Sequence, residues 1–184
     1  AMGFSKAQFF ESPEKFTKTD SLKGSNTKFR NFWDVKKYDI ILEPNFEAKS
    51  IKGSNKISIE IEKNVTNPIF QIDLQKPMKA DKIKANFPIV EKRIDGDFIF
   101  LHTKRSFKKG EKLAIDIDFS GNPVIAKNAP WDGGWMFAKD KNGNPWMTVA
   151  DEGIGESIWR PCNVSWGDAP DHVTPFTVVR PQHV

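Results

Sequence analysis

The densest group of residues able to do chemistry is acidic and consists of Asp151, Glu152 and Glu156, separated by Gly153 and Gly155. A glycine beside a carboxylate lets the backbone approach a ligand closely, because glycine has no side chain. Carboxylates near tryptophan are good receptors for an ammonium group, since they accept charge-assisted hydrogen bonds beside the negative face of an indole. The alternative is an ordinary acidic loop, and the residue types alone do not decide between the two.

This chain has few residues that could carry out other kinds of catalysis. The single cysteine, Cys162, excludes an internal disulfide and a zinc cluster built from cysteines. It follows a proline among aromatic residues with no neighbouring histidine as base, which favours a buried structural thiol. The three histidines, His102, His172 and His183, are not paired at metal-ligand spacing, so this chain alone cannot form a His-rich catalytic metal site. Glycoside hydrolysis would require a second acidic pair in a comparable context, which the sequence lacks.

Composition and charge exclude several classes of protein. A chain of 184 residues with 15 Phe and 6 Trp is too aromatic to be disordered and suits one domain with an irregular extension. No apolar run approaches the ~20 residues of a membrane-spanning helix. The net charge is +4, but residues 131–184 are acidic and contain five of the six tryptophans. Lysines alternate with apolar residues and arginines are few, which favours a solvated sheet face over a nucleic-acid interface. The Trp-rich part is either core or a surface that receives a cation or a partner domain.

The elements that must position these residues are predicted to be strands. Apolar and polar residues alternate most regularly over 51–62, as in a half-buried antiparallel strand. Asp95-Gly96 predicts a hairpin, and residues 140–145 predict a second one. With no long helical period, the sequence predicts an all-β fold, an antiparallel β-sandwich or open barrel. Further strands are expected over residues 38–43, 70–74, 83–87, 98–101, 113–119, 146–149 and 173–179.

The two ends of the chain differ from this pattern. Residues 1–30 lack a clear period and are expected to form an extended, partly irregular N-terminal arm, with one short helical turn at Ser12–Lys15. Residues 31–184 are expected to form the β-sandwich domain. No secretory signal segment opens the chain. It stops without a closing turn, so we expect it to be part of a longer protein.

A series of short segments occurs in order between residues 20 and 180. They are residues 20–25 (DSLKGS), 32–40 (FWDVKKYDI), 50–55 (SIKGSN), 70–75 (FQIDLQ), 109–111 (KGE), 119–123 (FSGNP), 131–134 (WDGG), 153–162 (GIGESIWRPC) and 167–171 (GDAPD). This series resembles the opening of M1-family zinc aminopeptidases, most nearly the bacterial, cold-active-aminopeptidase-like branch. The resemblance implies a saddle-shaped N-terminal β domain that packs on a thermolysin-like catalytic domain of the same parent chain.

The resemblance also implies how the parent protein works. The family's Gly-x-Met-x-Asn and His-Glu-x-x-His motifs are absent here, so zinc is expected in the missing catalytic domain and not in this chain. Glu152 matches the family's Gln or Glu that binds the free N-terminus of a peptide substrate, with Asp151 and Gly153 adjacent. Many relatives in the nearest branch have Gln there, whereas Glu keeps the acceptor oxygens and adds a charge. The branch implies a secreted or periplasmic location.

Two other classes of function remain possible from the residues. One is a Trp-rich carbohydrate-binding module that presents Trp131, Trp135 or Trp146 as stacking platforms. The other is a structural or interaction domain. Exposed coplanar rings would favour sugar binding, whereas tryptophans buried at a junction would favour the peptidase domain.

The first prediction concerns the purified chain of 184 residues. We expect it to retain no stoichiometric zinc and to be inactive on aminoacyl-anilides, because structural zinc sites usually need four ligands and its His and Cys residues form no compact set. Metal analysis after gel filtration and a spectrophotometric assay check both points. One zinc per chain, or measurable hydrolysis, would contradict the expectation.

Overall fold

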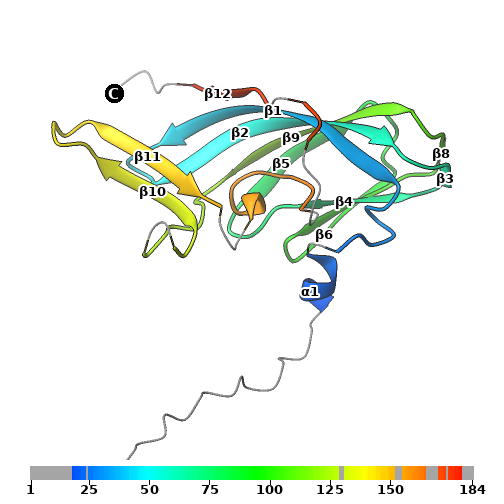
Figure 1. Cartoon of the computed structure of the whole chain (residues 1–184), viewed down its shortest axis with the longest axis horizontal. Helices are drawn as coiled ribbons and strands as arrows, with labels where there is room; N and C mark the ends of the chain where they lie inside the picture. The colour runs from blue at the N-terminus through cyan, green and yellow to red at the C-terminus, as the bar shows by residue number, and fades with distance from the viewer. Residues whose placement is uncertain are drawn as a thin grey trace, which may run out of the picture.

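The structure, a computed structural model, describes residues 18–23, 25–128, 131–151, 155–164, 170–172 and 174–179. It confirms the predicted all-β class, with strands in curved antiparallel layers and no closed barrel among the described residues (Figure 1). In that part of the chain no helix has the length and apolar character that a membrane crossing requires.

The largest layer is a five-stranded sheet in the order β12-β1-β2-β9-β5. Its antiparallel strands are β1 (Trp33–Asn45), β2 (Ser50–Ile61), β9 (Lys112–Gly121) and β5 (Lys79–Ala85). The strand predicted at the end of the described chain is confirmed as β12 (Phe176–Val178), and it pairs in parallel with β1. The long strands β1 and β2 curve together along the top of the molecule in Figure 1.

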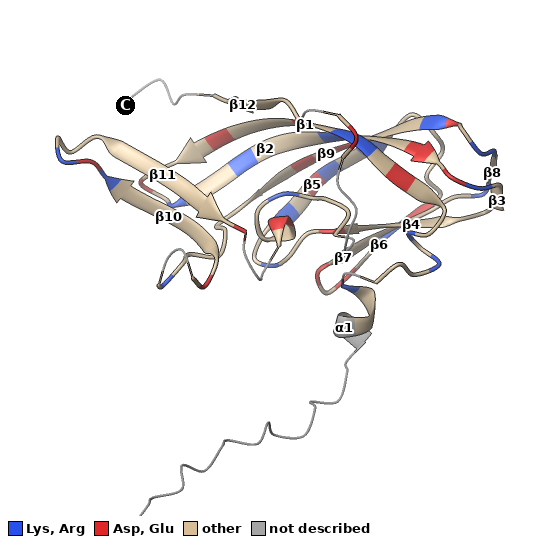
Figure 2. Cartoon of the chain, in the orientation of Figure 1, with Lys and Arg blue, Asp and Glu red and all other residues tan. Residues whose placement is uncertain are grey.

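The predicted alternation sets the two faces of this sheet. In β2, Ile57 and Ile59 are at most 1% exposed and face the core. On the outer face, Lys56 lies opposite Asp39 of β1 and Asp116 of β9, and Asp116 also lies opposite a lysine of β5. Figure 2 shows charged residues of both signs distributed along these strands. Opposite charges on neighbouring strands attract each other, so the Lys-rich face is a solvated sheet surface.

A smaller sheet forms the second layer, in the order β4 (Ile69–Asp73), β7 (Phe98–His102) and β6 (Glu91–Asp95). The hairpin predicted at Asp95-Gly96 joins β6 to β7. The unbroken apolar run of β7 is buried on both faces, because Phe29 and the Arg93 guanidinium cover Phe100 at 5.3 and 4.5 Å. Strand β6 is exposed and polar, so the sequence pattern did not reveal it. Two further short strands, β3 (Val65–Thr66) and β8 (Ser106–Phe107), pair with each other in an antiparallel sheet.

Aromatic side chains fill the space between the two sheets. Phe70 of β4 is fully buried and lies at the centre of this cluster. Its ring centroid is 5.0 to 5.9 Å from those of Phe32, Trp33, Phe87 and Phe107. Edge-on aromatic pairs at this distance add specific attraction to the burial of area, so the cluster locks the two sheets together.

A separate hairpin extends from the sandwich. It consists of β10 (Gly134–Lys139) and β11 (Pro145–Ala150), and the turn predicted over residues 140–145 connects them. At its tip the Asp140 carboxylate accepts the backbone N–H groups of Asn142 and Asn144, both at 2.8 Å. This carboxylate stabilises the turn itself, as expected for a plain hairpin.

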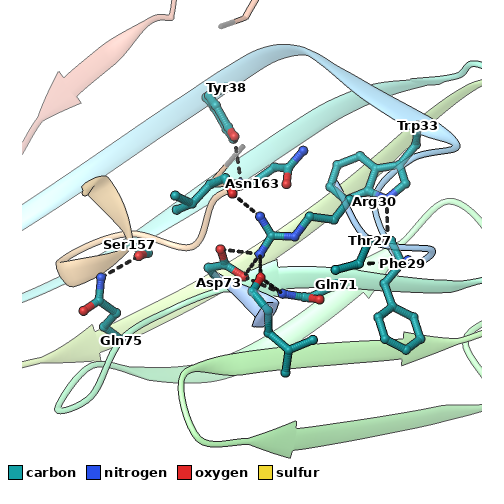
Figure 3. Close-up of polar contacts among 12 residues, drawn as sticks. Thr27, Phe29, Arg30, Trp33, Tyr38, Gln71, Asp73, Gln75, Ser157 and Asn163 are labelled. Atoms are coloured by element: carbon teal, nitrogen blue, oxygen red, sulfur yellow. Dashed lines mark hydrogen bonds and ion pairs between the residues drawn. The ribbon is translucent and has the colours of Figure 1, made fainter. Parts of the chain in front are cut away.

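The N-terminal part is anchored by a buried ion pair. Within the expected arm, the described residues form helix α1 (Lys18–Leu22) and a turn before β1, while Ser12–Lys15 lies outside the described residues. Arg30 and Asp73 are each 2% exposed, and Arg30 Nη2 lies 2.6 Å from Asp73 Oδ2 (Figure 3). Arg30 also donates to the backbone oxygens of Leu22 and Val164, and Gln71 donates to Asp73 at 3.2 Å. One guanidinium therefore joins α1, β4 and the segment after β11.

That later segment lies between the two sheets. Cys162 exchanges two backbone hydrogen bonds with Asp73, of 2.8 and 3.0 Å. Asn55 of β2 donates to the Pro161 oxygen at 2.8 Å, and the Asn163 N–H donates to the Tyr38 hydroxyl at 3.0 Å. These bonds fix residues 161–163 against both layers.

The second prediction tests the ion pair. Asp73→Asn keeps the shape of the side chain but leaves the Arg30 charge buried without its partner, so we expect a loss of about 3–5 kcal/mol in the free energy of unfolding. The matched control is Glu43→Gln, which breaks the exposed 3.0 Å pair with Lys52 and should cost less than about 1 kcal/mol. Urea denaturation measures both. Equal midpoints for the two variants would contradict the structural role of the pair.

Candidate functional site

The acidic cluster predicted from sequence begins where β11 ends. Asp151 directly follows the strand, and its backbone oxygen accepts the Gly155 N–H at 2.9 Å. Gly155 has φ +77°, which side chains with a Cβ rarely adopt, so the turn requires glycine here. Glu152 and Gly153, the predicted substrate-binding residue and its neighbour, lie outside the described residues. The geometry reported below is that of the residues on either side.

Asp151 is held by a tryptophan. Its side chain is half-buried, and its Oδ1 atom accepts the Trp159 Nε1–H at 3.1 Å. Burial raises the pKa of Asp151, and the negative charge of Glu156 raises it further, while the Trp159 bond and Arg160 oppose the rise. The indole N–H is therefore a specific donor to a carboxylate that is partly removed from water.

Glu156 has a partner of its own. It begins the short 3₁₀ helix η1 (Glu156–Ile158), and its carboxylate accepts Arg160 Nη2. Arg160 is 5% exposed and lies over the Tyr38 ring at 4.3 Å, so its position is fixed by packing as well as by charge. Sequence reasoning missed this pair, although the spacing of four residues between Glu156 and Arg160 is a signal for it. An ammonium ligand would have to compete with Arg160 for Glu156.

A chain of ring contacts connects this region with the rest of the fold. We call it the aromatic ladder, and its members are Phe46, Phe137, Trp135, Trp159 and Phe176. Trp159 lies 5.8 Å from Trp135 and 5.9 Å from Phe176, both edge to face. Trp135 stacks on Phe137 at 5.6 Å, and Phe137 meets Phe46 at 6.1 Å. The ladder fixes the β10–β11 hairpin between the β1–β2 turn, β12 and the 3₁₀ helix.

The exposure of the tryptophans bears on the alternative functions. Trp135 and Trp159 are 2% and 6% exposed at the junction between hairpin and sheet. Trp131 is 86% exposed in the loop before β10, and Trp146 is 49% exposed on β11. Trp135 is therefore no stacking platform for a sugar. The hairpin register places the Trp131 loop and Trp146 near opposite ends, because Gly134 pairs with Ala150 and Lys139 with Pro145.

Cys162 has a structural position, and the other His, Asp and Glu side chains of the described residues form no metal cluster. Cys162 is 1% exposed and burial raises the pKa of its thiol, which confirms the prediction that this thiol is buried. Among the residues that the structure describes, no group of three or more His, Cys, Asp or Glu side chains is placed to hold a metal ion.

Comparisons with known proteins support the fold. No protein-family model matches the sequence, and no curated protein matches it. Among solved structures, an M1 zinc metallopeptidase mutant from Deinococcus radiodurans bound to a Tyr-Ser-Ala substrate matches with a TM-score of 0.58 and 20% identity, over 81% of this chain and 32% of that chain. A two-domain M1 zinc metallopeptidase mutant bound to L-tryptophan matches with a TM-score of 0.59 and 19% identity, over 83% and 33%.

Another structure of an M1 zinc metallopeptidase from Deinococcus radiodurans also matches, with a TM-score of 0.54 and 18% identity, over 83% of this chain and 33% of that chain. This chain thus spans about a third of the length of the structures that it matches. The resemblance that the ordered sequence motifs indicate is confirmed at the level of three-dimensional structure: the chain has the fold of the N-terminal domain of M1 zinc metallopeptidases.

Proposed function

We propose that this chain is the N-terminal domain of a zinc-dependent M1-type aminopeptidase, and that it forms one wall of the active site. The observation that carries the proposal is the shared fold, together with an acidic, Trp-flanked turn at the end of β11. Proteins of this fold have been captured with a Tyr-Ser-Ala substrate and with the amino acids L-tryptophan and L-arginine. All three ligands carry a free α-amino group, which an acidic turn suits chemically.

Within the acidic cluster, we assign the substrate's α-ammonium to Glu152. Asp151 is engaged by Trp159 and Glu156 is engaged by Arg160, so each already has a partner in the chain. Glu152 lies between them in sequence, and we assign it to the ligand because the resemblance carried by the sequence motifs matches it to the family's amine-binding position. A carboxylate accepts charge-assisted hydrogen bonds from an ammonium. The negative charges of Asp151 and Glu156 on either side in the sequence strengthen the attraction.

In this proposal the chemistry of bond cleavage belongs to the parent's catalytic domain. Among the described residues no group of three or more His, Cys, Asp or Glu side chains is placed to hold a metal ion, and in this proposal the zinc ligands belong to the catalytic domain. Zinc bound in the catalytic domain would polarise the scissile carbonyl group and activate a water molecule. The role of Glu152 is to hold the amino end of the peptide at a fixed distance from that centre, which restricts cleavage to the first residue.

The hairpin also offers a surface for the catalytic domain. Val124, Ile125 and Trp131 are 38%, 43% and 86% exposed, and all belong to the connection from β9 to β10. Ile125 bridges to Trp135, and Gly134 pairs with Ala150, so this connection lies at the same end of the hairpin as Asp151. We propose that this apolar surface packs on the catalytic domain. Interfaces between domains of one chain commonly bury about 600–1,500 Å².

The direct test of the proposed function is an assay of the parent gene product. It should cleave L-aminoacyl-4-nitroanilides that have a free amine, and a zinc chelator should abolish the activity. A parent protein that lacks a His-Glu-x-x-His motif after Val184 and has no such activity would overturn the proposal.

The third prediction concerns Glu152 in that parent enzyme. A hydrogen bond to a charged group contributes about 1.5–3 kcal/mol, so Glu152→Ala should lower kcat/KM on free-amine substrates roughly 10- to 100-fold. Glu152→Gln should lose less, because it keeps an acceptor oxygen. Steady-state kinetics on matched free and N-acetylated peptides measures the effect.

The control for this experiment is Glu156→Gln, which alters the neighbouring carboxylate that pairs with Arg160. It should lower the preference for a free amine much less than Glu152→Ala does, because it removes a neighbouring charge and not the acceptor of the ammonium. N-acetylated peptides lack the ammonium, so Glu152→Ala should hardly alter their slow turnover. Wild-type kcat/KM for Glu152→Ala on free-amine substrates would remove Glu152 from the assignment.

The fourth prediction concerns the proposed domain interface. In the chain of 184 residues, Trp131 and Trp146 should both react in hydroxyl-radical footprinting, because both are exposed. In the parent protein, the oxidation of Trp131 should fall several-fold, while Trp146 near the other end of the hairpin should change little. Mass spectrometry of the peptides measures both rates. Equal oxidation of Trp131 in the two proteins would show that this surface is not the interface.

A further inference from the structure

The five-stranded sheet has two edge strands of different character. At one edge β5 carries Lys79, Lys82 and Lys84, and its pairing with β9 shifts register between Ala80 and Lys82. Charged side chains and bulges are features that keep an edge strand from pairing with other chains. At the other edge β12 has the sequence Phe-Thr-Val, all exposed, with neither a charge nor a bulge. It lies outside β1 in Figure 1, and no described strand pairs with its far side.

The backbone of β12 uses alternate residues to bind β1. The Pro175 oxygen accepts a backbone N–H of β1 at 2.9 Å, and the Val179 N–H donates to a backbone oxygen of β1 at 2.7 Å. Residues 175, 177 and 179 therefore direct their polar backbone groups toward β1. The backbone groups of Phe176 and Val178 point to the free edge, because the direction alternates along a strand. Pro175 does not block this edge, since its missing N–H lies on the β1 side.

The side chains of β12 continue the two faces of the larger sheet. Phe176 pairs with Ile40 and Val178 pairs with Leu42, so both lie on the inner face. They are 50% and 44% exposed, whereas their neighbours on β1 are at most 4% exposed. Thr177, between them, lies on the solvated outer face. The inner face of the sheet therefore ends in two apolar side chains that the described residues leave partly uncovered.

We propose that the free edge of β12 binds the same strand of a second copy of this chain, antiparallel, about a two-fold axis at Thr177. This register places Phe176 of each copy opposite Val178 of the other copy, and the two Thr177 residues opposite each other. Phe176 and Val178 are the residues whose N–H and C=O groups point outward. Each such pair can therefore form both backbone hydrogen bonds of an antiparallel ladder.

The strand is complementary to itself, which selects a second copy as the occupant of the edge. Pairs of an aromatic and a β-branched residue, and Thr–Thr pairs, are favourable across antiparallel strands, and this register contains only these two kinds within β12. Because β12 has no charged residue, the two-fold axis brings no like charges within it together. A two-fold contact also closes with two copies and leaves no unpaired β12 edge for further association.

The first arm of the experiment measures self-association of the chain of 184 residues. Sedimentation velocity at up to about 1 mM protein should show a dimer, since interfaces of small area associate weakly. Thr177→Lys places two like charges opposite each other and should raise the dissociation constant roughly 10-fold or more. The matched control is Ile94→Lys, at a 61% exposed residue of the charged edge strand β6, and it should leave the constant unchanged. A wild-type chain that stays monomeric, or equal effects of both variants, would overturn the proposal.

A charge-reversal experiment tests the register. Thr177→Glu should weaken self-association as Thr177→Lys does, whereas an equimolar mixture of the two variants should form a heterodimer, because opposite charges then face each other. Since only folded chains can pair in this way, recovery in the mixture separates a lost contact from a lost fold. A mixture that remains as monomeric as either variant alone would contradict the two-fold axis at Thr177.

Hydrogen exchange followed by NMR tests the backbone geometry. The amides of Thr177 and Val179 face β1 and should be protected at every protein concentration. The amides of Phe176 and Val178 face the free edge and should gain protection only as the concentration rises. Protection of all four amides in dilute protein would show that another part of the same chain covers the edge, and would exclude the second copy as its occupant. Unprotected Phe176 and Val178 amides at the highest concentration would overturn the proposal as well.

Discussion

The buried ion pair between Arg30 and Asp73 is the constraint on which the rest of the structure depends. A charge removed from water is costly, so each of these groups needs its partner in place whenever the protein is folded. Arg30 also binds the ends of two other segments, at Leu22 and Val164. The N-terminal helix, the smaller sheet and the segment after β11 can therefore reach their positions only together. Because each of these segments requires the others, the ion pair specifies one arrangement of segments that are far apart in the sequence.

The described residues next to the candidate site are fixed by that arrangement. Cys162 pairs with Asp73 through the backbone, and Arg160 packs on Tyr38 of the main sheet. Trp159, between them, is fixed by the aromatic ladder and in turn holds Asp151. The described residues on either side of Glu152 are thus held by packed elements, and rigid elements commonly present binding residues. Charged residues of both signs are distributed along the strands of the larger sheet (Figure 2).

Much of the fold could be predicted from sequence, since side chains of a half-buried strand alternate with period two. The alternation over residues 51–62 became β2, and Asp95-Gly96 and residues 140–145 became hairpin turns. Strand β6 escaped this method because Glu91–Asp95 is an exposed, polar edge with no apolar face to read. The ordered motifs indicated the fold of the M1 peptidase N-terminal domain, even though the matched structures are only 18–20% identical.

The sequence by itself determined the strands, the turns and the acidic cluster, because these depend on residue type and local spacing. Only the tertiary structure decided which charges are free and which are paired. Arg30 and Asp73 are 43 residues apart, and Trp159 reaches Asp151 across a turn with no periodic signal. It also divided the tryptophans into buried Trp135 and Trp159 and exposed Trp131. Such contacts depend on the packing of distant segments, and local patterns of hydrophobicity carry no information about them.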